Sequence, residues 1–423
     1  MKKLRVFIFI LASMVLFLTG CSTTGEMVDG IGINNDLSIS EKMEDYGIPS
    51  VKISKPDVYY DGSFWVDRLC EEFEKADDYI VCLMFLGSEC DENQKIFDIL
   101  KEKSESGVDV FFITDGTGAF DMTESRYHLR PVDSLKESGV HVFVYNPFSV
   151  NRLSSGIGLF QREHRKFFVV DGKTLFIGGM NINYISTSSP SVGGQRDAMY
   201  CFHSSDVASL IMDDFVDYWN HECIDEVERS SFEIPNRSSC ETLNAWFVDQ
   251  YGTNLNIAKA YSVLINSAEK EVLSLPFLPY FDKNMLEMVS NAINRDVYYE
   301  MIIPFDSRIS QRNSTYYALL RIVETGANVL IENSSDEMVP LLHEKLLVVD
   351  SRYTLFGSSN FNYRSMNLSN EMIVIVDDIE FAQQVKDHYQ ELKQTTHLLD
   401  LETANNYQKL KYLPGFIFCF FGG

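Results

Sequence analysis

A stretch that occurs twice decides the fold: residues 164–186 read HRKFFVVDGKTLFIGGMNINYIS, and residues 343–365 read HEKLLVVDSRYTLFGSSNFNYRS. The two copies are offset by 179 residues without a gap, and ten of their 23 aligned positions are identical. Chance would match only about one or two positions, so the chain contains an internal duplication.

Each copy follows the pattern H-x-K-x-x-x-x-D, and G-x-x-N begins seven residues after the Asp. The shared residues are His164, Lys166, Asp171, Gly178 and Asn181 in the first copy, and His343, Lys345, Asp350, Gly357 and Asn360 in the second. On a strand, residues i and i+2 share a face, so each His and Lys should project side by side. Asp171-Gly172 is a hairpin signal. A two-residue loop there pairs residue 170 with 173 and returns Asn181 to His164, while glycines 178 and 179 leave room for a ligand.

This set of residues suits chemistry on a phosphodiester. Lys supplies positive charge and Asn supplies an NH2 donor for the non-bridging oxygens. Two histidines allow one to attack phosphorus while the other protonates the leaving oxygen. Asp171 and Asp350 belong to the same motifs, but they sit in the turn, and we expect them to hold the hairpin. No Cys or His spacing matches a metal site, so we expect neither a metal nor another cofactor.

Strands and helices alternate around both copies. We expect strands over residues 80–86, 108–115, 141–145, 272–275, 297–304 and 328–331, and helices over residues 92–106, around 135, 207–219, 282–294, 315–325 and 379–392. This alternation predicts an α/β fold with a largely parallel sheet in each half. We place the first half at residues 56–240 and the second at 241–423.

The two motifs resemble the HKD motifs of the phospholipase D superfamily, and the pattern is most similar to that of bacterial cardiolipin synthases. The resemblance covers nearly all of the chain after residue 56 and includes Arg162, Arg196-Asp197, Arg364-Ser365 and Glu371. It implies two pseudo-symmetric α/β halves with one shared, metal-free active site and a phosphohistidine intermediate. It makes His164 the nucleophile and His343 the general acid and base. Asp197 and Glu371 match the acids that orient the histidines.

The sequence departs from that pattern at Glu163, where Asn is usual, at Gln195, where Trp is usual, and at Ser369, where Asn is usual. These changes leave the expected chemistry intact and concern the choice of substrate. A carboxylate at Glu163 is expected to weaken the binding of a second anionic lipid. Whether water or an alcohol resolves the intermediate stays open.

The N-terminal residues indicate export and lipidation. Lys2, Lys3 and Arg5 precede an apolar run over residues 6–18, which is short for a membrane span and typical of a signal peptide. Thr19-Gly20-Cys21 resembles a bacterial lipobox, so residues 1–20 are expected to be removed and Cys21 acylated. A flexible tether should follow over residues 21–55. The lipid would anchor the protein on the extracytoplasmic face of a bacterial envelope membrane.

The formal net charge is −25, from 36 Lys and Arg against 61 Asp and Glu. Such a surface makes nucleic acid an unlikely partner and leaves a phospholipid substrate as the leading hypothesis. The alternatives are a secreted nuclease-like phosphodiesterase and a non-catalytic surface lipoprotein. The apolar residues 414–423 are too few to span a bilayer. They either pack on the body, which we favour, or dip into the lipid interface.

Overall fold

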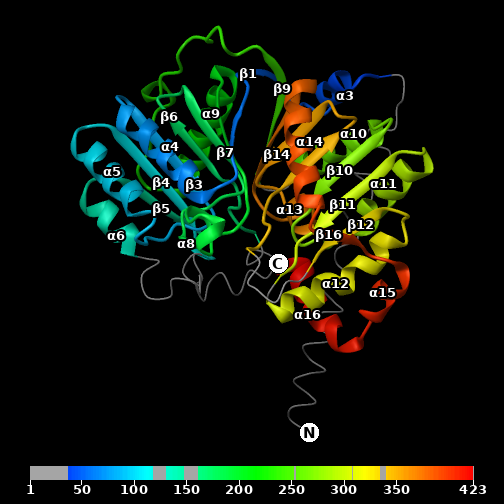
Figure 1. The fold of residues 1–423 in the computed structure, drawn as a ribbon. Helices are drawn as coiled ribbons and strands as arrows, with labels where there is room; N and C mark the ends of the chain where they lie inside the picture. The colour runs from blue at the N-terminus through cyan, green and yellow to red at the C-terminus, as the bar shows by residue number, and fades with distance from the viewer. Residues whose placement is uncertain are drawn as a thin grey trace.

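The computed structural model describes residues 37–117, 130–146, 161–251, 254–306, 308–333 and 340–422, which form two α/β halves (Figure 1). The expected signal peptide and Cys21 lie outside the described residues. Each half is built on one mixed sheet, and the two sheets have seven and nine strands.

The first sheet has the strand order β2-β8-β7-β6-β3-β4-β5. Its strands are β2 (Asp57–Tyr59), β3 (Tyr79–Met84), β4 (Asp109–Asp115), β5 (His141–Tyr145), β6 (Phe167–Val170), β7 (Thr174–Gly178) and β8 (Met199–His203). Its helices are α4 (Gly62–Lys75), α5 (Gln94–Glu105), α6 (Arg130–Glu137), α8 (Tyr184–Thr187) and α9 (Ser205–Glu222).

The second sheet repeats this order: β15-β14-β13-β10-β11-β12 corresponds to β8-β7-β6-β3-β4-β5. Its strands are β1 (Ser50–Ile53), β9 (Leu243–Gln250), β10 (Glu271–Leu275), β11 (Tyr298–Ile303), β12 (Asn328–Glu332), β13 (Leu346–Val349), β14 (Tyr353–Gly357), β15 (Glu371–Asp377) and β16 (Thr396–Leu398). Its helices are α10 (Asn256–Ser267), α11 (Lys283–Asn294), α12 (Ile309–Val323), α13 (Tyr363–Asn367), α14 (Ile379–Lys393) and α15 (Leu401–Asn406). The repeated order confirms the predicted pair of pseudo-symmetric α/β halves.

The expectation of largely parallel sheets was wrong. In the first sheet only the pairs β3–β4 and β4–β5 are parallel, and in the second sheet only the pairs β10–β11 and β11–β12 are parallel. The strands that carry the motifs follow one another through short hairpins, as in β6 and β7, and therefore pair antiparallel.

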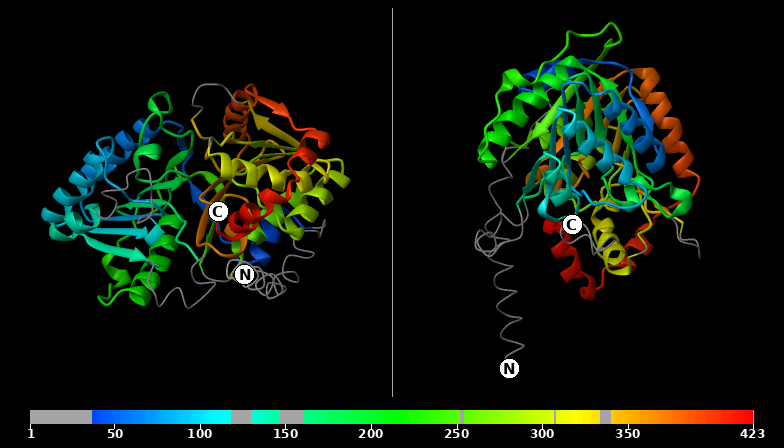
Figure 2. Two further views of the ribbon diagram at one scale, coloured as in Figure 1. Left: turned by 90° about the horizontal axis from the view of Figure 1, so that it is seen from below. Right: turned by 90° about the vertical axis from the view of Figure 1, so that its left-hand side faces the viewer.

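Helices cover the outer face of each sheet, and α9 and α14 pack between the halves (Figures 1 and 2). Both inner helices begin with a capped N-terminus: the side chains of Ser204 and Asp378 accept from the backbone N–H of the third helical residue. Their apolar residues join one core with residues of both sheets, and Tyr200 stacks on Phe356 across it with ring centroids 3.8 Å apart. The halves therefore share a continuous apolar interior.

Part of the expected tether is folded, which corrects the prediction for residues 37–55. Helix α3 (Ile39–Asp45) begins at a capping box formed by Ser38 and Glu41, and β1 (Ser50–Ile53) pairs antiparallel with β9. β1 thus forms an edge of the second sheet, whereas β2, which follows within a few residues, belongs to the first sheet. The chain crosses between the halves here before either motif begins.

The C-terminal residues fold against the second half. The short helix η6 (Leu410–Tyr412) leads into α16 (Leu413–Gly422), which packs on α12 and α13. The structure thus confirms that the C-terminal residues pack on the body, which was the interpretation favoured from the sequence. Across the described ranges, no helix combines the length and apolar character needed to cross a bilayer.

Candidate active site

The two motif histidines lie at the same edge of matching strands. His164 comes three residues before β6, and His343 comes three residues before β13. All residues of β6 and β13 are buried, so both strands are fixed in their sheets. The residues that directly precede β6 and β13, which include the two histidines, lie at the junction of the two halves.

Chain segments of the two halves interlock at this junction. The backbone N–H of His164 donates to the carbonyl of Asn370 at 3.0 Å, and that of His343 donates to the carbonyl of Arg196 at 2.7 Å. Isolated parallel bridges accompany both contacts. Asn370 and Arg196 each directly precede an acidic residue. Each half therefore delivers its acid to the histidine of the other half.

The two histidine–carboxylate pairs are accordingly crossed between the halves. His164 Nδ1 lies 3.0 Å from both carboxylate oxygens of Glu371, and His343 Nδ1 lies 2.6 Å from Asp197 Oδ2. The four side chains are at most 13% exposed. A carboxylate on Nδ1 fixes the tautomer and the ring orientation, which directs Nε2 toward a substrate.

The glycines near Asn181 have a different use from the one expected. A Cβ atom on Gly179 would lie 2.2 Å from Asp197 Oδ1, so Gly179 makes room for the acid rather than for a ligand. The equivalent residue of the second copy is Ser358, whose hydroxyl donates to Glu371 at 2.5 Å. Ser365 also donates to Glu371, at 2.6 Å. A glycine therefore makes room for Asp197, whereas two serine hydroxyls hold Glu371.

A buried lysine accompanies each histidine. Lys166 Nζ donates to the carbonyl of His164 at 2.7 Å, and Lys345 Nζ lies 2.8 Å from His343 Nδ1. Burial lowers the pKa of Lys166 to about 7 and that of Lys345 to about 8. A phosphate anion beside these amines would favour their charged forms, so the pair is suited to an anionic ligand.

Burial also shifts the pKa of the groups that would take part in proton transfer. It lowers the pKa of His164 well below its usual range, with a further contribution from the charges of Lys166 and Arg364. The pKa of His343 is lowered to about 4 by burial and by Lys345, against the opposing charge of Asp197. His164 is thus neutral, as a nucleophile must be. His343 must take up a proton before it can act as a general acid, which the negative charges of Asp197 and of a bound phosphodiester would favour.

Both motif asparagines are buried, and the hairpin that leads to Asn181 has a different register from the expected one. Val170 pairs with Thr174, so the loop has three residues and the register shifts by one. Asn181 Oδ1 accepts from the backbone N–H of Leu86 at 3.1 Å. Asn360 is buried in the equivalent part of the second half.

The motif aspartates lie away from the histidines, at the opposite ends of β6 and β13. Asp171 accepts backbone N–H bonds from Asp77, Asp78 and Tyr79 at 2.9 to 3.0 Å. Asp350 binds the three backbone N–H groups of residues 269–271 in the same way. Each aspartate ties its hairpin to the start of a neighbouring strand, which supports the structural role and not a catalytic one.

Two phenylalanines of the site escaped the sequence analysis. The ring of Phe85 lies edge-on to His164 with centroids 5.0 Å apart, and Phe277 takes the same place against His343 at 4.5 Å. Lys166 and Lys345 lie over the same two rings. Both phenylalanines come just after a parallel strand, β3 or β10, and that position is the signal that could have revealed them.

Glu163 is engaged with protein groups rather than exposed to a ligand. It is fully buried, and its carboxylate accepts from Arg165 at 2.8 and 2.9 Å and from Asn370 at 3.0 Å. Arg165 also binds Asp214 at 2.5 Å and Asp249 at 3.0 Å. The guanidinium compensates the charge of Glu163, so the expected repulsion of a second anionic lipid has no support in this geometry.

Replacing Arg165 by Met should strongly destabilise the protein. The fully buried Glu163 would lose its cation, and the partly exposed Asp214 and Asp249 would lose a partner, which together cost about 3–5 kcal/mol of unfolding free energy. Arg229→Met is the matched control, because Arg229 pairs with Asp213 at the surface and should cost less than about 1 kcal/mol. Urea unfolding monitored by circular dichroism measures both, and equal losses would contradict the role given to Arg165.

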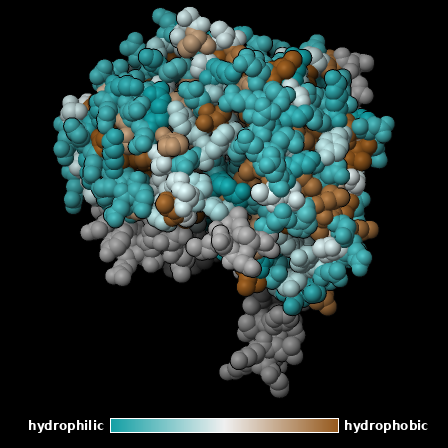
Figure 3. Space-filling model, in the orientation of Figure 1, coloured by the Kyte–Doolittle hydropathy of each residue, from teal (hydrophilic) through white to brown (hydrophobic). Residues whose placement is uncertain are grey.

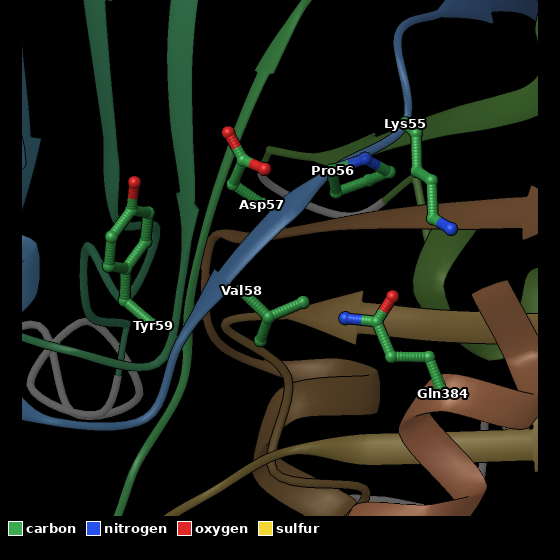
Figure 4. Close-up of a pocket in the computed structure, with 6 residues that line it drawn as sticks. All are labelled: Lys55, Pro56, Asp57, Val58, Tyr59 and Gln384. Carbon is green, nitrogen blue, oxygen red and sulfur yellow. The ribbon is translucent and has the colours of Figure 1, made fainter.

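Two other features of the described residues were compared with this site, a surface pocket and the groups of potential metal ligands. An open pocket of about 480 Å³ lies between residues 55–59 and Gln384 of α14 (Figure 4), and its lining includes none of the motif residues. Among the described residues there is no group of three or more His, Cys, Asp or Glu side chains arranged to hold a metal ion.

Comparison with known proteins agrees with this geometry. The chain is 24% identical over 335 residues to the probable cardiolipin synthase YwiE of Bacillus subtilis, covering 77% of this chain and 63% of that protein. It is 26% identical over 348 residues to a cardiolipin synthase of Listeria welshimeri, covering 79% of this chain and 68% of that protein. The chain thus spans about two thirds of the length of these relatives.

Solved structures match the fold. The phosphatidylserine synthase of Haemophilus influenzae aligns over 90% of this chain and 96% of its own, with a TM-score of 0.66 and 15% identity. The polyphosphate kinase of Porphyromonas gingivalis aligns over 86% of this chain and 53% of its own, with a TM-score of 0.54 and 14% identity. The family model described as "Cardiolipin synthase, PLD-like domain" matches residues 69–219 and again residues 261–393. Since these two matches cover more than half of the sequence and each contains one motif, the chain belongs to the PLD-like family of the cardiolipin synthases.

Proposed function

We propose that this protein transfers or hydrolyses phosphatidyl groups of phospholipids, by the double-displacement chemistry of phospholipase D-type enzymes. The observation that carries the proposal is the pair of imidazoles at one junction, each oriented by an acid of the other half and accompanied by a buried lysine. The cardiolipin synthases among its relatives support a phospholipid as the substrate.

In the proposed reaction His164 Nε2 forms a bond to phosphorus as the bond to the leaving oxygen breaks. His343 gives that oxygen a proton and then takes one from water or an alcohol, which attacks phosphorus and releases His164. Lys166, Lys345, Asn181 and Asn360 stabilise the charge on the non-bridging oxygens. Asp197 and Glu371 act as positioning residues on the two imidazoles.

The test is headgroup release from mixed phospholipid vesicles, run with and without excess EDTA and with added glycerol. Turnover that survives EDTA is expected, and phosphatidylglycerol formation from added glycerol would identify a transferase. A matched variant is His221→Ala, since His221 is exposed at the end of α9 and should be dispensable. Cleavage of single-stranded DNA with intact lipids would favour the nuclease alternative, and inactivity on both would favour the non-catalytic lipoprotein.

The rate of reaction should fall on the alkaline side of neutrality. The active free enzyme needs charged lysines, and these lose their protons as the pH rises through about 7 to 8. For a p-nitrophenyl phosphodiester, kcat/KM should therefore fall about tenfold per pH unit between about pH 7 and 8, and about a hundredfold per unit above about pH 8, where both lysines lose their protons. Lys345→Arg should keep the fall that begins near pH 7, which belongs to Lys166, and should reduce the slope above about pH 8 to about tenfold per unit. A profile that is flat to pH 10 in the unmodified enzyme would contradict the charged role of the lysines.

We further propose that Cys21 carries a lipid that anchors the protein to the outer face of a bacterial membrane. Metabolic labelling with a fatty acid should tag the wild-type protein. Cys21→Ala should lose the label and leave a larger precursor, whereas Cys240→Ala, which changes an exposed cysteine of the folded body, should keep it. Equal labelling of wild type and Cys21→Ala would disprove the anchor.

A further inference from the structure

The C-terminal helix presents apolar side chains on two sides. Its inner side packs on the body: Phe416 lies 5.8 Å from Tyr280 between ring centroids, and Phe420 stacks on Tyr363 at 4.5 Å. On its outer side Phe418 is 65% exposed, and Leu410 of η6 is 84% exposed. An apolar helix that is packed on one side and uncovered on the other is typical of a docking element.

A third exposed apolar residue, Ile309, begins α12 beside the same helix. It is 65% exposed, and Gln311, two residues later, accepts a hydrogen bond from Cys419 Sγ of α16 at 3.5 Å. We call Ile309, Leu410 and Phe418 the apolar edge. α12 and α16 pack side by side at the lower end of the second half (Figure 1, and as a space-filling view in the same orientation in Figure 3).

The charge around the apolar edge is opposite to that of the whole chain. From Thr403 to Gly423 the sequence has two lysines and no acidic residue, although the net charge of the chain is −25. The two lysines, Lys409 and Lys411, are exposed on either side of Leu410. Basic residues that flank exposed Phe and Leu side chains favour the interface of an anionic bilayer.

The apolar edge is also close to the candidate active site. Cys419 of α16 belongs to a small buried cluster with Phe277, against which Phe416 and Phe420 pack. Phe277 contacts the ring of His343. On a second route, Phe420 stacks on Tyr363, and the next residue, Arg364, contributes to the low pKa of His164. Phe277 thus links the packing of α16 to His343, and Figure 2 shows α16 on the underside of the second half.

We infer that the apolar edge inserts into the surface of a bilayer that contains anionic phospholipid, and that Lys409 and Lys411 contact its headgroups. This docking brings the site against the membrane that holds its substrate, and in that respect the inference rests on the proposed function. It gives α16 a role that a lipid on Cys21 does not supply, because a flexible tether holds the protein near a membrane without orienting it.

The experiment places a fluorophore on the apolar edge of the full-length protein. Phe418→Trp is compared with Phe64→Trp, whose site on α4 of the first half is 66% exposed and therefore matched in exposure. The native Trp65, Trp219 and Trp246 are buried and give a constant background. With vesicles of phosphatidylglycerol and brominated phosphatidylcholine, the emission added by Phe418→Trp should shift to the blue and be quenched, whereas the emission added by Phe64→Trp should not change.

If the brominated lipid quenched the emission of both introduced tryptophans equally, or quenched neither, the inference would be overturned. Replacing Lys409 and Lys411 by Gln should raise the vesicle concentration needed for half-maximal quenching by roughly tenfold or more. Loss of self-association in Phe418→Asp, measured by sedimentation without lipid, would instead identify the apolar edge as a contact between two copies of the chain.

Turnover supplies a second, separable readout. Phe418→Asp should reduce the cleavage of vesicle phospholipid and leave the cleavage of a soluble p-nitrophenyl phosphodiester unchanged. An equal fall on both substrates would reveal a structural role and overturn the inference. If the wild type cleaves neither substrate, the proposed function fails, and the quenching comparison still decides whether the apolar edge meets a bilayer.

Discussion

His164→Ala is expected to abolish turnover of phospholipids and of a p-nitrophenyl phosphodiester alike, by roughly 10⁴-fold or more. The reason is that attack on phosphorus precedes every later step, whatever the leaving group. His343→Ala should be equally inactive in steady-state turnover of phospholipids, because their leaving group needs a proton. The two variants should differ on the activated diester, whose p-nitrophenolate leaves without one.

On that substrate His343→Ala should release one equivalent of p-nitrophenolate and then stop. No base remains to activate water or alcohol, so the phosphohistidine accumulates on His164. Intact-protein mass spectrometry at neutral or alkaline pH would detect the adduct, and the same analysis of His164→Ala is the control. An adduct on His343 in the control, with none in His343→Ala, would mean that the two roles are reversed.

Glu371→Gln and Asp197→Asn should differ from each other in the same way as the two histidine variants. Each acid variant should resemble the variant of the histidine that the acid contacts, which belongs to the other half. Glu371 contacts His164, so Glu371→Gln should slow both substrates, by about 10³- to 10⁴-fold. Asp197 contacts His343, so Asp197→Asn should slow phospholipid turnover by a similar factor and spare the single burst on the activated diester. Both changes keep the size of the side chain and remove its negative charge.

The single burst of p-nitrophenolate is the measurement that distinguishes the two acid variants. If each acid served the histidine of its own half, the two phenotypes would be exchanged: Asp197→Asn would lose the burst, and Glu371→Gln would keep it. The burst therefore tests the crossed pairs directly. Circular dichroism of both variants should remain that of the wild type.

The sequence was sufficient for the fold class because the duplication specifies the same order of elements twice. The strand at His141–Tyr145 was predicted with its observed bounds, and helices α11 and α14 were predicted to within one residue at each end. His343 and Lys345 lie side by side, as the alternation of an extended chain predicts, although both residues precede β13 and do not belong to it. The hairpin register was wrong by one residue, because Val170 pairs with Thr174 and the loop therefore has three residues instead of two.

The sequence could not predict that each acid contacts the histidine of the other half. Asp197 and Glu371 were recognised by resemblance, but spacing along the chain does not say which histidine an acid will meet. That depends on how the halves dock, through contacts such as the stacking of Tyr200 on Phe356. Phe85 and Phe277 were missed because one aromatic residue after a strand is a common pattern. The catalytic roles remain predictions for the experiments above.

The position of β1 has a consequence for how the chain folds. Every strand of the first sheet comes from residues 57–203, so no strand of the second half is needed to complete it. The second sheet is complete only when Ser50 meets Trp246, about 200 residues later, a contact of high sequence separation that forms late. A chain shortened to begin at residue 56, where the first half was predicted to start, would lose the strand that covers β9. The exposed edge of β9 would then be open to pairing with other molecules, so such a shortened protein should aggregate.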